Sequence, residues 1–261
     1  MNTDPRKFAF IACVNNLRQY AICERHLAGL RVPEGFSVDR VVVEGAKGMA
    51  EGYNEGLRRT DARYKVYLHQ DTYVLNPDLL FELLRLFESP RVGLIGVVGA
   101  TRLPASGVWF HAGLHSFGQV WENRTGGGLK KLLGPLNRRQ DRLMRFRPVP
   151  RPYLPAVVVD GLFMATQYDL PWREDLGFGF IYYEGPQCCE FIKAGYEVII
   201  PHQERDAVWC MHYGGESDVP ASADPAYQAR FAANMEVFRR EYADFIKVDV
   251  RELLRRYRVA D

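Results

Sequence analysis

Three polar residues, His69-Gln70-Asp71, directly follow Tyr64–Leu68, an apolar run with the length of a β-strand. In open α/β sheets, ligands bind in the crevice at the carboxyl ends of the strands, so an acid at this point can face a ligand. A carboxylate there suits a hard divalent cation that is bound together with a diphosphate. Glu44 ends another apolar run in the equivalent position. Either acid could instead cap the helix that follows it.

A carboxylate later in the chain could contribute a base. Glu184 begins a segment with helical periodicity. A carboxylate can take the proton of an acceptor hydroxyl if it lies within hydrogen-bond distance. A helix N-terminus favours the ionised form of an acid, so we expect Glu184 to be charged at neutral pH. The same preference could place Glu184 there without catalysis.

The elements that must position these residues alternate along the chain. Apolar runs with the length of strands are separated by helix-like patterns in the first hundred residues, at 8–14, 36–44, 64–68 and 92–98. This alternation predicts βαβ units and a mostly parallel sheet. The later pattern predicts a buried strand at 156–167, interrupted by Asp160-Gly161, and a second strand at 196–201. It also predicts three helices, at 184–194, 226–242 and 250–257.

The order of these motifs resembles that of family 2-like glycosyltransferases with the GT-A fold, in their bacterial glycosyltransferase-like branch, over roughly residues 8–215. The resemblance depends on a series of segments: Val14-Asn15-Asn16, Val41-Val42-Val43-Glu44-Gly45, Gly52-Tyr53-Asn54-Glu55-Gly56, Tyr67–Thr72, Glu184 and Ala194-Gly195-Tyr196-Glu197-Val198. It implies a Rossmann-like, three-layer α/β/α domain. A single such domain would span residues 1–261, with a nucleotide-binding half at 1–100, an acceptor half at 101–220 and C-terminal helices at 221–261.

The resemblance also implies roles for individual residues. The nucleotide-sugar would contact Glu44, Gly48, Gly52, Asn54, His69, Gln70 and Asp71. The Asp-x-Asp type of metal motif falls on His69-Gln70-Asp71, where only the last residue is an acid, so Asp71 is an expected metal ligand. The segment Cys210–Gly215 resembles a late segment of the family whose histidine completes the metal site, so His212 is the other expected ligand, although a structural hydrogen bond could also explain it. Asp160 and Gly161 match the turn beneath the acceptor. Glu184 matches the catalytic base, and Pro186 stands where a second acid is usual.

The activity implied by the resemblance is transfer of a sugar from a UDP- or GDP-linked donor to a hydroxyl of a glycan or lipid-linked acceptor. Inversion by direct in-line attack and assistance by Mn²⁺ or Mg²⁺ belong to the same expectation, as does a place in bacterial polysaccharide or glycan biosynthesis. The incomplete metal motif and Pro186 leave two alternatives open. One is a non-catalytic module that binds nucleotide-sugars or glycans, and the other is a metal-dependent hydrolase that uses His69, Asp71 and His212.

Composition excludes several classes of protein. The chain has 261 residues and 34 basic against 32 acidic side chains, so the net charge of +2 gives no global reason to bind nucleic acid. Its apolar runs are shorter than the roughly 18–20 residues that span a bilayer, and the N-terminus leads into a strand-like segment rather than a signal peptide. Five cysteines without a C-x-x-C pattern favour reduced thiols and a cytoplasmic location.

A strongly basic stretch at residues 129–151 has three interpretations. It contains eight Lys or Arg residues against one acid, Asp141, with leucines, Met144 and Phe146 among them. It could be a solvated loop, a lid that closes on a diphosphate or an acidic acceptor, or a contact with an anionic membrane surface. The last interpretation would place the protein at the inner face of the membrane and would suit a lipid-linked acceptor.

Overall fold

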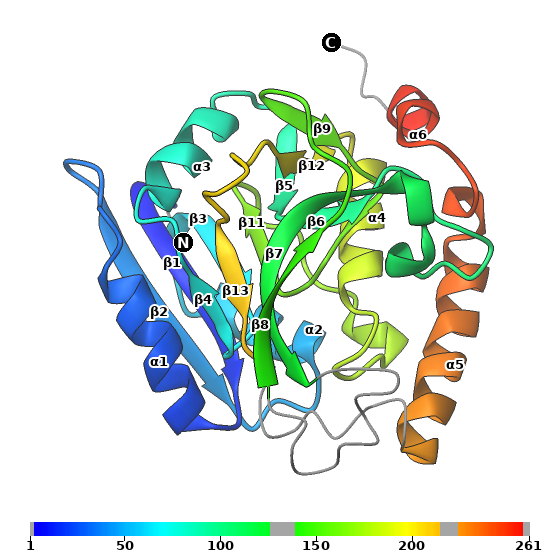
Figure 1. Cartoon of the computed structure of the whole chain (residues 1–261), viewed down its shortest axis with the longest axis horizontal. Helices are drawn as coiled ribbons and strands as arrows, with labels where there is room; N and C mark the ends of the chain where they lie inside the picture. The colour runs from blue at the N-terminus through cyan, green and yellow to red at the C-terminus, as the bar shows by residue number, and fades with distance from the viewer. Residues whose placement is uncertain (1–2, 126–138, 215–223, 258–261) are drawn as a thin grey trace.

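The computed structural model describes residues 3–125, 139–214 and 224–257, and Figure 1 shows their arrangement. Its described helices are α1 (Leu17–Ala28), α2 (Met49–Arg58), α3 (Leu79–Phe87), α4 (Glu184–Lys193), α5 (Pro225–Glu241) and α6 (Val250–Tyr257). Helix α2 packs against strands β1 (Asp4–Val14) and β2 (Ser37–Glu44). Helix α4 packs against β5 (Val92–Gly96), β10 (Val158–Val159) and β12 (Glu197–Pro201). Among the described residues, none of the helices combines the length and the apolar character needed to cross a lipid bilayer.

A large mixed sheet runs through the centre of the molecule. In spatial order its strands are β2 (Ser37–Glu44), β1 (Asp4–Val14), β3 (Ala62–Leu68), β11 (Phe163–Thr166), β5 (Val92–Gly96), β12 (Glu197–Pro201) and β9 (Tyr153–Pro155). Strands β2, β1, β3, β5 and β12 run parallel, whereas β11 and β9 are antiparallel to their neighbours. The predicted α/β class is therefore confirmed, and the sheet is mixed rather than parallel throughout.

A second sheet crosses in front of the first in the view of Figure 1. Its strands, in order, are β10 (Val158–Val159), β6 (Val98–Ala100), β7 (Ser116–Thr125), β13 (Cys210–His212) and β4 (Thr72–Val74), and β8 (Arg139–Arg145) pairs with β7. Strand β4 follows the end of β3 after three residues. The two sheets therefore meet at the segment that carries His69-Gln70-Asp71.

Two predicted strands are each divided between the two sheets. The run at 92–98 forms β5 and β6, with Val97 between them, and the run at 156–167 forms β10 and β11, with Asp160-Gly161 between them. The prediction of one strand at 92–98 was wrong because burial is continuous through that run, so apolarity alone does not indicate where the chain leaves one sheet for the other. The second run divides at Asp160-Gly161, where the sequence predicted an interruption. The apolar side chains of both sheets belong to one contiguous buried cluster.

The amide of Gln70 joins the carboxyl ends of β1 and β3. Its Oε1 accepts hydrogen bonds from the backbone N–H groups of Asn15 and Asn16 at 3.0 and 2.9 Å, and its Nε2 donates to Asn15 Oδ1 at 2.6 Å. Asn16 in turn caps α1, because its side chain accepts a hydrogen bond from Gln19 N. These bonds hold the ends of the two parallel strands beside each other, which forms one wall of the predicted ligand crevice.

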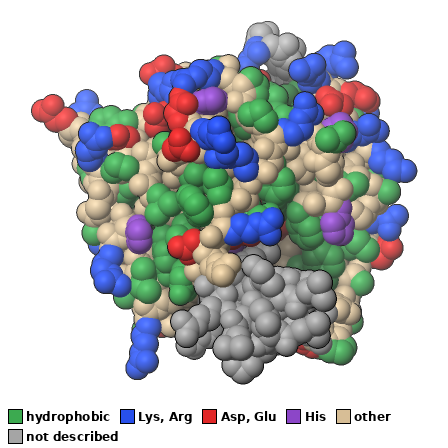
Figure 2. Space-filling model, in the orientation of Figure 1, with side chains coloured by type: hydrophobic (Ala, Val, Ile, Leu, Met, Phe, Trp, Pro, Cys, Tyr) green, Lys and Arg blue, Asp and Glu red, His purple; other side chains and the backbone are tan. Residues whose placement is uncertain are grey.

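Charged side chains of both signs are interspersed on the face shown in Figure 2. This distribution agrees with the near balance of acidic and basic residues in the sequence. Apolar side chains also reach this face in several places between the charged groups.

Close packing of α2 on β1 depends on Gly52. A Cβ atom at this position would lie 2.3 Å from Cys13 Sγ and 2.9 Å from Ala46 Cβ. We expect Gly52→Ala to lower the free energy of unfolding by about 1–3 kcal/mol, because an overpacked site forces the helix away from the sheet. Urea unfolding followed by circular dichroism measures this change.

Two further variants test that explanation. Cys13→Ala removes the sulfur atom that the new methyl group meets. The double variant Gly52→Ala/Cys13→Ala should therefore recover part of the stability that Gly52→Ala loses. Gly29→Ala is the matched control, because a Cβ there meets only ordinary contacts, at 3.5 Å from His26 O. Equal losses for Gly52→Ala and Gly29→Ala would show that helix packing at Gly52 is not the cause.

Candidate functional site

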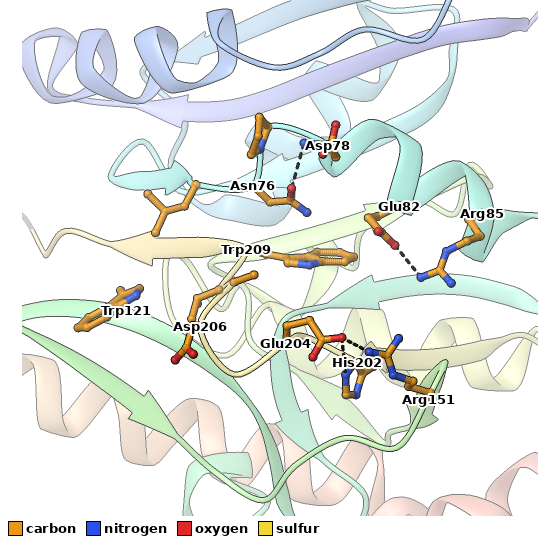
Figure 3. Close-up of a pocket in the computed structure, with 14 residues that line it drawn as sticks. Asn76, Asp78, Glu82, Arg85, Trp121, Arg151, His202, Glu204, Asp206 and Trp209 are labelled. Atoms are coloured by element: carbon orange, nitrogen blue, oxygen red, sulfur yellow. Dashed lines mark hydrogen bonds and ion pairs between the residues drawn. The ribbon is translucent and has the colours of Figure 1, made fainter.

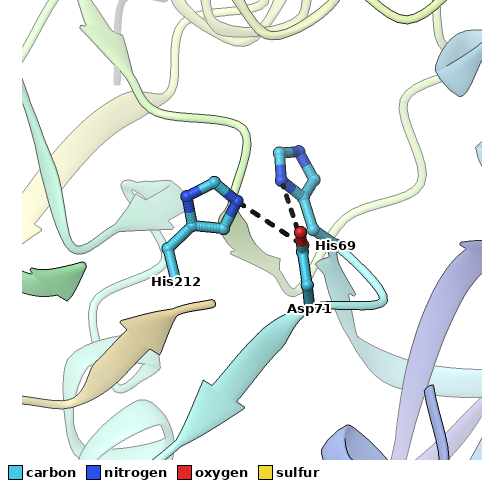
Figure 4. A group of neighbouring side chains, drawn as sticks. All are labelled: His69, Asp71 and His212. Atoms are coloured by element: carbon cyan, nitrogen blue, oxygen red, sulfur yellow. Dashed lines mark ion pairs between the residues drawn. The ribbon is translucent and has the colours of Figure 1, made fainter. Parts of the chain in front are cut away.

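Three predicted site residues meet where the two sheets join. Asp71 lies between β3 and β4, and the antiparallel pairing of His212 with Thr72 brings the last residue of β13 beside it. His212 Nε2 is 3.4 Å from Asp71 Oδ1, and His69 Nδ1 is 3.9 Å from the same oxygen (Figure 4). One candidate ligand atom from each of the three residues lies within 4.8 Å of the others. We call these residues the His–Asp–His cluster.

Charge and burial set the protonation of Asp71 and His69 so that both can bind a cation. Burial alone would raise the pKa of Asp71, but the hydrogen bond and charge of His212 and the charge of His69 outweigh it and hold the pKa below its usual value. Burial lowers the pKa of His69 despite the opposing charge of Asp71. At neutral pH the cluster therefore offers an ionised carboxylate and a neutral His69 imidazole.

A tyrosine orients His69 from the other side of its ring. His69 Nε2 is hydrogen-bonded to the hydroxyl of Tyr183. When Nδ1, which faces Asp71, is free to accept a cation, the ring proton is on Nε2 and is donated to the tyrosine oxygen. Gly161 makes this contact sterically feasible, because a Cβ atom there would lie 2.2 Å from that oxygen.

The His–Asp–His cluster fits a divalent metal ion by its chemistry. Within the described ranges it is the one group of three His, Cys, Asp or Glu residues close enough to hold an ion. Two imidazoles and a carboxylate are ligands that divalent transition metals accept, and the hydrogen bond from His69 to Tyr183 is the outer contact that commonly fixes such a histidine. Asp71 and His212 therefore lie where the expected metal ligands should be, with His69 as a third candidate.

Two clefts open on either side of the cluster. The first, of about 300 Å³, is lined by Cys13, Val14, Asn15, Val43, Gly45, Ala46, Met49, His69, Gln70, Asp71 and Phe180. The second, of about 230 Å³, is lined by aromatic and apolar residues together with His69, Glu122, Asp160, Gly161, Glu184 and His212. His69 and Phe180 line both clefts. The arrangement can hold two ligands that meet beside the cluster.

Glu184 and Asp160 lie together in the second cleft. Burial and the negative charge of Asp160 raise the pKa of Glu184 to about 8. The expectation that the N-terminus of α4 keeps Glu184 ionised at neutral pH was therefore wrong, because the helix end is too weak to offset both effects. Asp160 Oδ1 accepts a hydrogen bond from Leu162 N at 2.8 Å, which forms the turn between β10 and β11.

The other predicted nucleotide contacts are distributed along β2 and α2. Glu44 ends β2 with an exposed side chain, and its neighbours line the first cleft. A Cβ atom on Gly48 would lie 2.8 Å from Gly179 Cα, and Gly52 packs against Cys13. The amide of Asn54 is buried and bonds to the backbone of Trp172 and to Glu174.

These contacts give Gly48, Gly52 and Asn54 structural roles. The role of these three residues and of Glu44 in nucleotide binding stays a prediction. Asn54 is the residue for which the contacts support it least, because both ends of its amide already have protein partners.

Sequence reasoning missed Tyr183 and Phe180. Tyr183 directly precedes Glu184 and contacts His69 across more than a hundred residues of sequence, so a sequence pattern could not relate them. For Phe180 a signal was present, since it directly follows the glycine-rich segment Gly177-Phe178-Gly179. Glycines readily adopt positive φ angles, so this segment indicates a tight turn of the chain.

The basic stretch at 129–151 is only partly described. Residues 129–138 lie outside the described residues, and 139–145 form β8. Arg145 bonds to Gln119 and to a backbone carbonyl, and Arg147 donates to Leu114 O at 3.0 Å. These arginines stabilise the protein itself, and neither a lid nor a membrane contact is tested by their positions.

A larger cleft, of about 380 Å³, lies on the other face of the second sheet (Figure 3). Trp121 lines it, whereas its neighbour Glu122 lines the cleft that contains Glu184, and successive residues of a strand point to opposite faces. Its arginines pair with its acids, Arg151 with Glu204 and Arg85 with Glu82. Because it does not reach the cluster, we place the candidate site in the two smaller clefts.

Comparison with solved structures identifies the fold. The mannosyltransferase PcManGT from Pyrobaculum calidifontis, in complex with GDP-Man and Mn²⁺, is similar with a TM-score of 0.54 and 15% identity, over 96% of this chain and 68% of that chain. S. aureus TarS 1-349 in complex with UDP-GlcNAc has a TM-score of 0.54 and 10% identity, over 95% and 69% of the two chains. The same protein in complex with UDP has a TM-score of 0.50 and 10% identity, over 95% and 68%. The fold is therefore of the GT-A type.

A search of curated proteins found no match. The model of the glycosyltransferase-like family, by contrast, matches residues 9–234, which is most of the chain. This match confirms the resemblance that the order of the sequence motifs indicated. The chain belongs to the glycosyltransferase-like family, among the family 2-like glycosyltransferases.

Proposed function

We propose that the protein transfers a sugar from a UDP- or GDP-linked donor to a hydroxyl group of a glycan or lipid-linked acceptor. The observation that carries this proposal is the meeting of two clefts at the His–Asp–His cluster in a chain of this family. The nucleotide would lie in the first cleft, beside the ends of β1 and β2, and the acceptor in the second. The nucleotide-sugar complexes of PcManGT and TarS support this choice of donor.

Glu184 is our candidate for the catalytic base. It lies in the second cleft with Asp160, where an acceptor hydroxyl would bind. The base form is the carboxylate, which takes the acceptor proton while the acceptor oxygen attacks the anomeric carbon. Attack from this side, opposite to a nucleotide in the first cleft, is in line with the departing diphosphate and would invert the anomeric configuration. Proton NMR of the first product formed distinguishes inversion from retention.

A divalent metal held by His69, Asp71 and His212 would offset the negative charge that develops on the departing diphosphate. The ligand set favours Mn²⁺ over Mg²⁺, because Mg²⁺ prefers oxygen ligands and two of the three side chains are imidazoles. The complex of PcManGT with Mn²⁺ agrees with this preference.

A single assay separates this function from its two alternatives. The protein is incubated with UDP-GlcNAc or GDP-Man, Mn²⁺ and a panel of glycan and lipid-linked acceptors, and the products are separated by chromatography. A glycosylated acceptor together with the nucleoside diphosphate supports transfer. Binding without turnover supports a non-catalytic module, and sugar phosphate or inorganic phosphate supports a metal-dependent hydrolase. Either of these last two results would overturn the proposed activity.

The first prediction concerns the metal. Asp71→Asn removes the negative ligand between the imidazoles, so Mn²⁺ affinity measured by calorimetry in the presence of UDP or GDP should fall by about 10- to 100-fold or more. The parent protein should bind Mn²⁺ more tightly than Mg²⁺. Asp206→Asn changes an acid in the larger cleft and is the matched control, with unchanged affinity. Equal Mn²⁺ affinity in Asp71→Asn and the parent would remove the cluster from the metal site.

The second prediction concerns the pH dependence of transfer. Because the pKa of Glu184 is raised to about 8, most of this group is protonated at neutral pH and the base form accumulates as the pH rises. Below that pKa, kcat/KM should therefore rise by about tenfold per pH unit, and above it kcat/KM should level off.

Glu184→Gln tests the assignment of that pH dependence. Transfer should fall by roughly 10²- to 10⁴-fold, and the rise with pH should disappear, because the amide cannot accept a proton. Donor affinity should be unchanged, since the nucleotide lies in the other cleft. Glu236→Gln, an exposed position on α5, is the control and should transfer at the parent rate. If the rise with pH persists in Glu184→Gln, another group is the base, and Asp160 in the same cleft is the next candidate.

A further inference from the structure

Phe180 lies where the two clefts meet. It lines both of them together with His69, and 56% of its surface is exposed although it is a large apolar residue. A single exposed apolar residue is common on protein surfaces and needs no explanation by itself. The position of Phe180 between two clefts that His69 also lines is what distinguishes it.

The loop that carries Phe180 has an unusual backbone. Gly177 and Gly179 have φ angles of 65° and 63°, and Tyr182 has a φ of 73°, which non-glycine residues seldom adopt. Phe178 and Tyr182 are buried, with 7% of their surfaces exposed. The chain therefore turns two aromatic side chains into the core and directs Phe180, between them, into the clefts.

Contacts on both sides fix this loop. Asn234 of α5 donates hydrogen bonds to Phe178 O at 2.9 Å and to Ile181 O at 3.1 Å. Met49 N, at the start of α2, donates to Gly179 O at 2.8 Å, and only a glycine at position 48 leaves room for Gly179. Because the backbone on either side of Phe180 is held by two helices, its exposure is enforced by the fold.

We propose that the ring of Phe180 is the binding platform for the transferred sugar, against whose apolar face it stacks. A pyranose has a face of C–H groups and an edge of hydroxyl groups, and an aromatic ring packs well against the C–H face. The carboxyl groups of Glu122, Asp160 and Glu184, which line the second cleft, can accept hydrogen bonds from the hydroxyl edge. The inference rests on the proposed function, because it assigns the sugar of the donor to this junction.

The test compares a nucleotide with its sugar-bearing form. Dissociation constants of UDP and UDP-GlcNAc, and of GDP and GDP-Man, are measured by calorimetry with Mn²⁺ for the parent protein and for Phe180→Ala. In the pair that the parent binds, the nucleotide-sugar should bind more tightly than the nucleotide alone. Phe180→Ala should reduce this advantage by about 2- to 12-fold, which is the range of one aromatic stacking contact, with little change in nucleotide affinity.

Further variants separate stacking from a structural effect. Phe180→Tyr and Phe180→Trp keep an aromatic ring and should retain the advantage of the nucleotide-sugar, whereas Phe180→Leu is apolar without a ring and should lose it. Phe81→Ala is the matched control, because Phe81 is 46% exposed on α3 and lines neither cleft of the site. Thermal unfolding confirms that each variant is folded.

Failure of the inference differs from failure of the proposed function. If the parent binds neither nucleotide, the proposed function is wrong and the inference falls with it. If the parent binds a nucleotide-sugar no more tightly than the nucleotide alone, Phe180 is not the platform. The same follows if Phe180→Ala keeps the full difference in affinity between the two ligands. In both cases the proposed function still stands. Equal losses in Phe180→Tyr and Phe180→Ala would likewise overturn stacking.

Discussion

The carboxylate of Asp71 lies in a largely buried position between two imidazoles that come from distant parts of the sequence. A buried charge without partners would cost several kcal/mol, so the fold has to bring partners to it. Strand β13 does this by pairing with β4, which places His212 beside Asp71, and Tyr213 N donates to Asp71 O at 2.8 Å. The junction of the two sheets, and with it the site, depends on this arrangement.

Close approach of backbone and side chains around that junction depends on small residues. Gly161 leaves room for the hydroxyl of Tyr183, which orients His69, and Gly48 leaves room for the loop that carries Phe180. The loop and the cluster together separate the clefts, and each cleft has its own chemistry. The first is formed by the ends of parallel strands, and the second holds Glu184 and Asp160 close enough for one carboxylate to alter the pKa of the other.

Local sequence patterns predicted the βαβ units and placed Asp71 at the end of a strand, because strand length and helical periodicity are local properties. They could not divide the run at 92–98 between two sheets, since its residues are buried on both sides of Val97. The protonation of Glu184 was mispredicted for a related reason, because its pKa is raised by burial and by the charge of Asp160, and both arise only from the packing of the folded chain. The resemblance to a family indicated His212, whose distance from Asp71 no local pattern reveals.

The central claim is that the His–Asp–His cluster binds a metal together with the donor diphosphate. Electron spin-echo envelope modulation of the protein loaded with Mn²⁺ and UDP or GDP tests this claim directly, because it detects nuclei close to the ion. The account predicts nitrogen couplings from imidazoles and phosphorus couplings from the nucleotide in the same sample, with the nitrogen couplings weakened in His212→Gln. Phosphorus couplings without nitrogen couplings would show that the ion binds the nucleotide away from the cluster and would contradict the account.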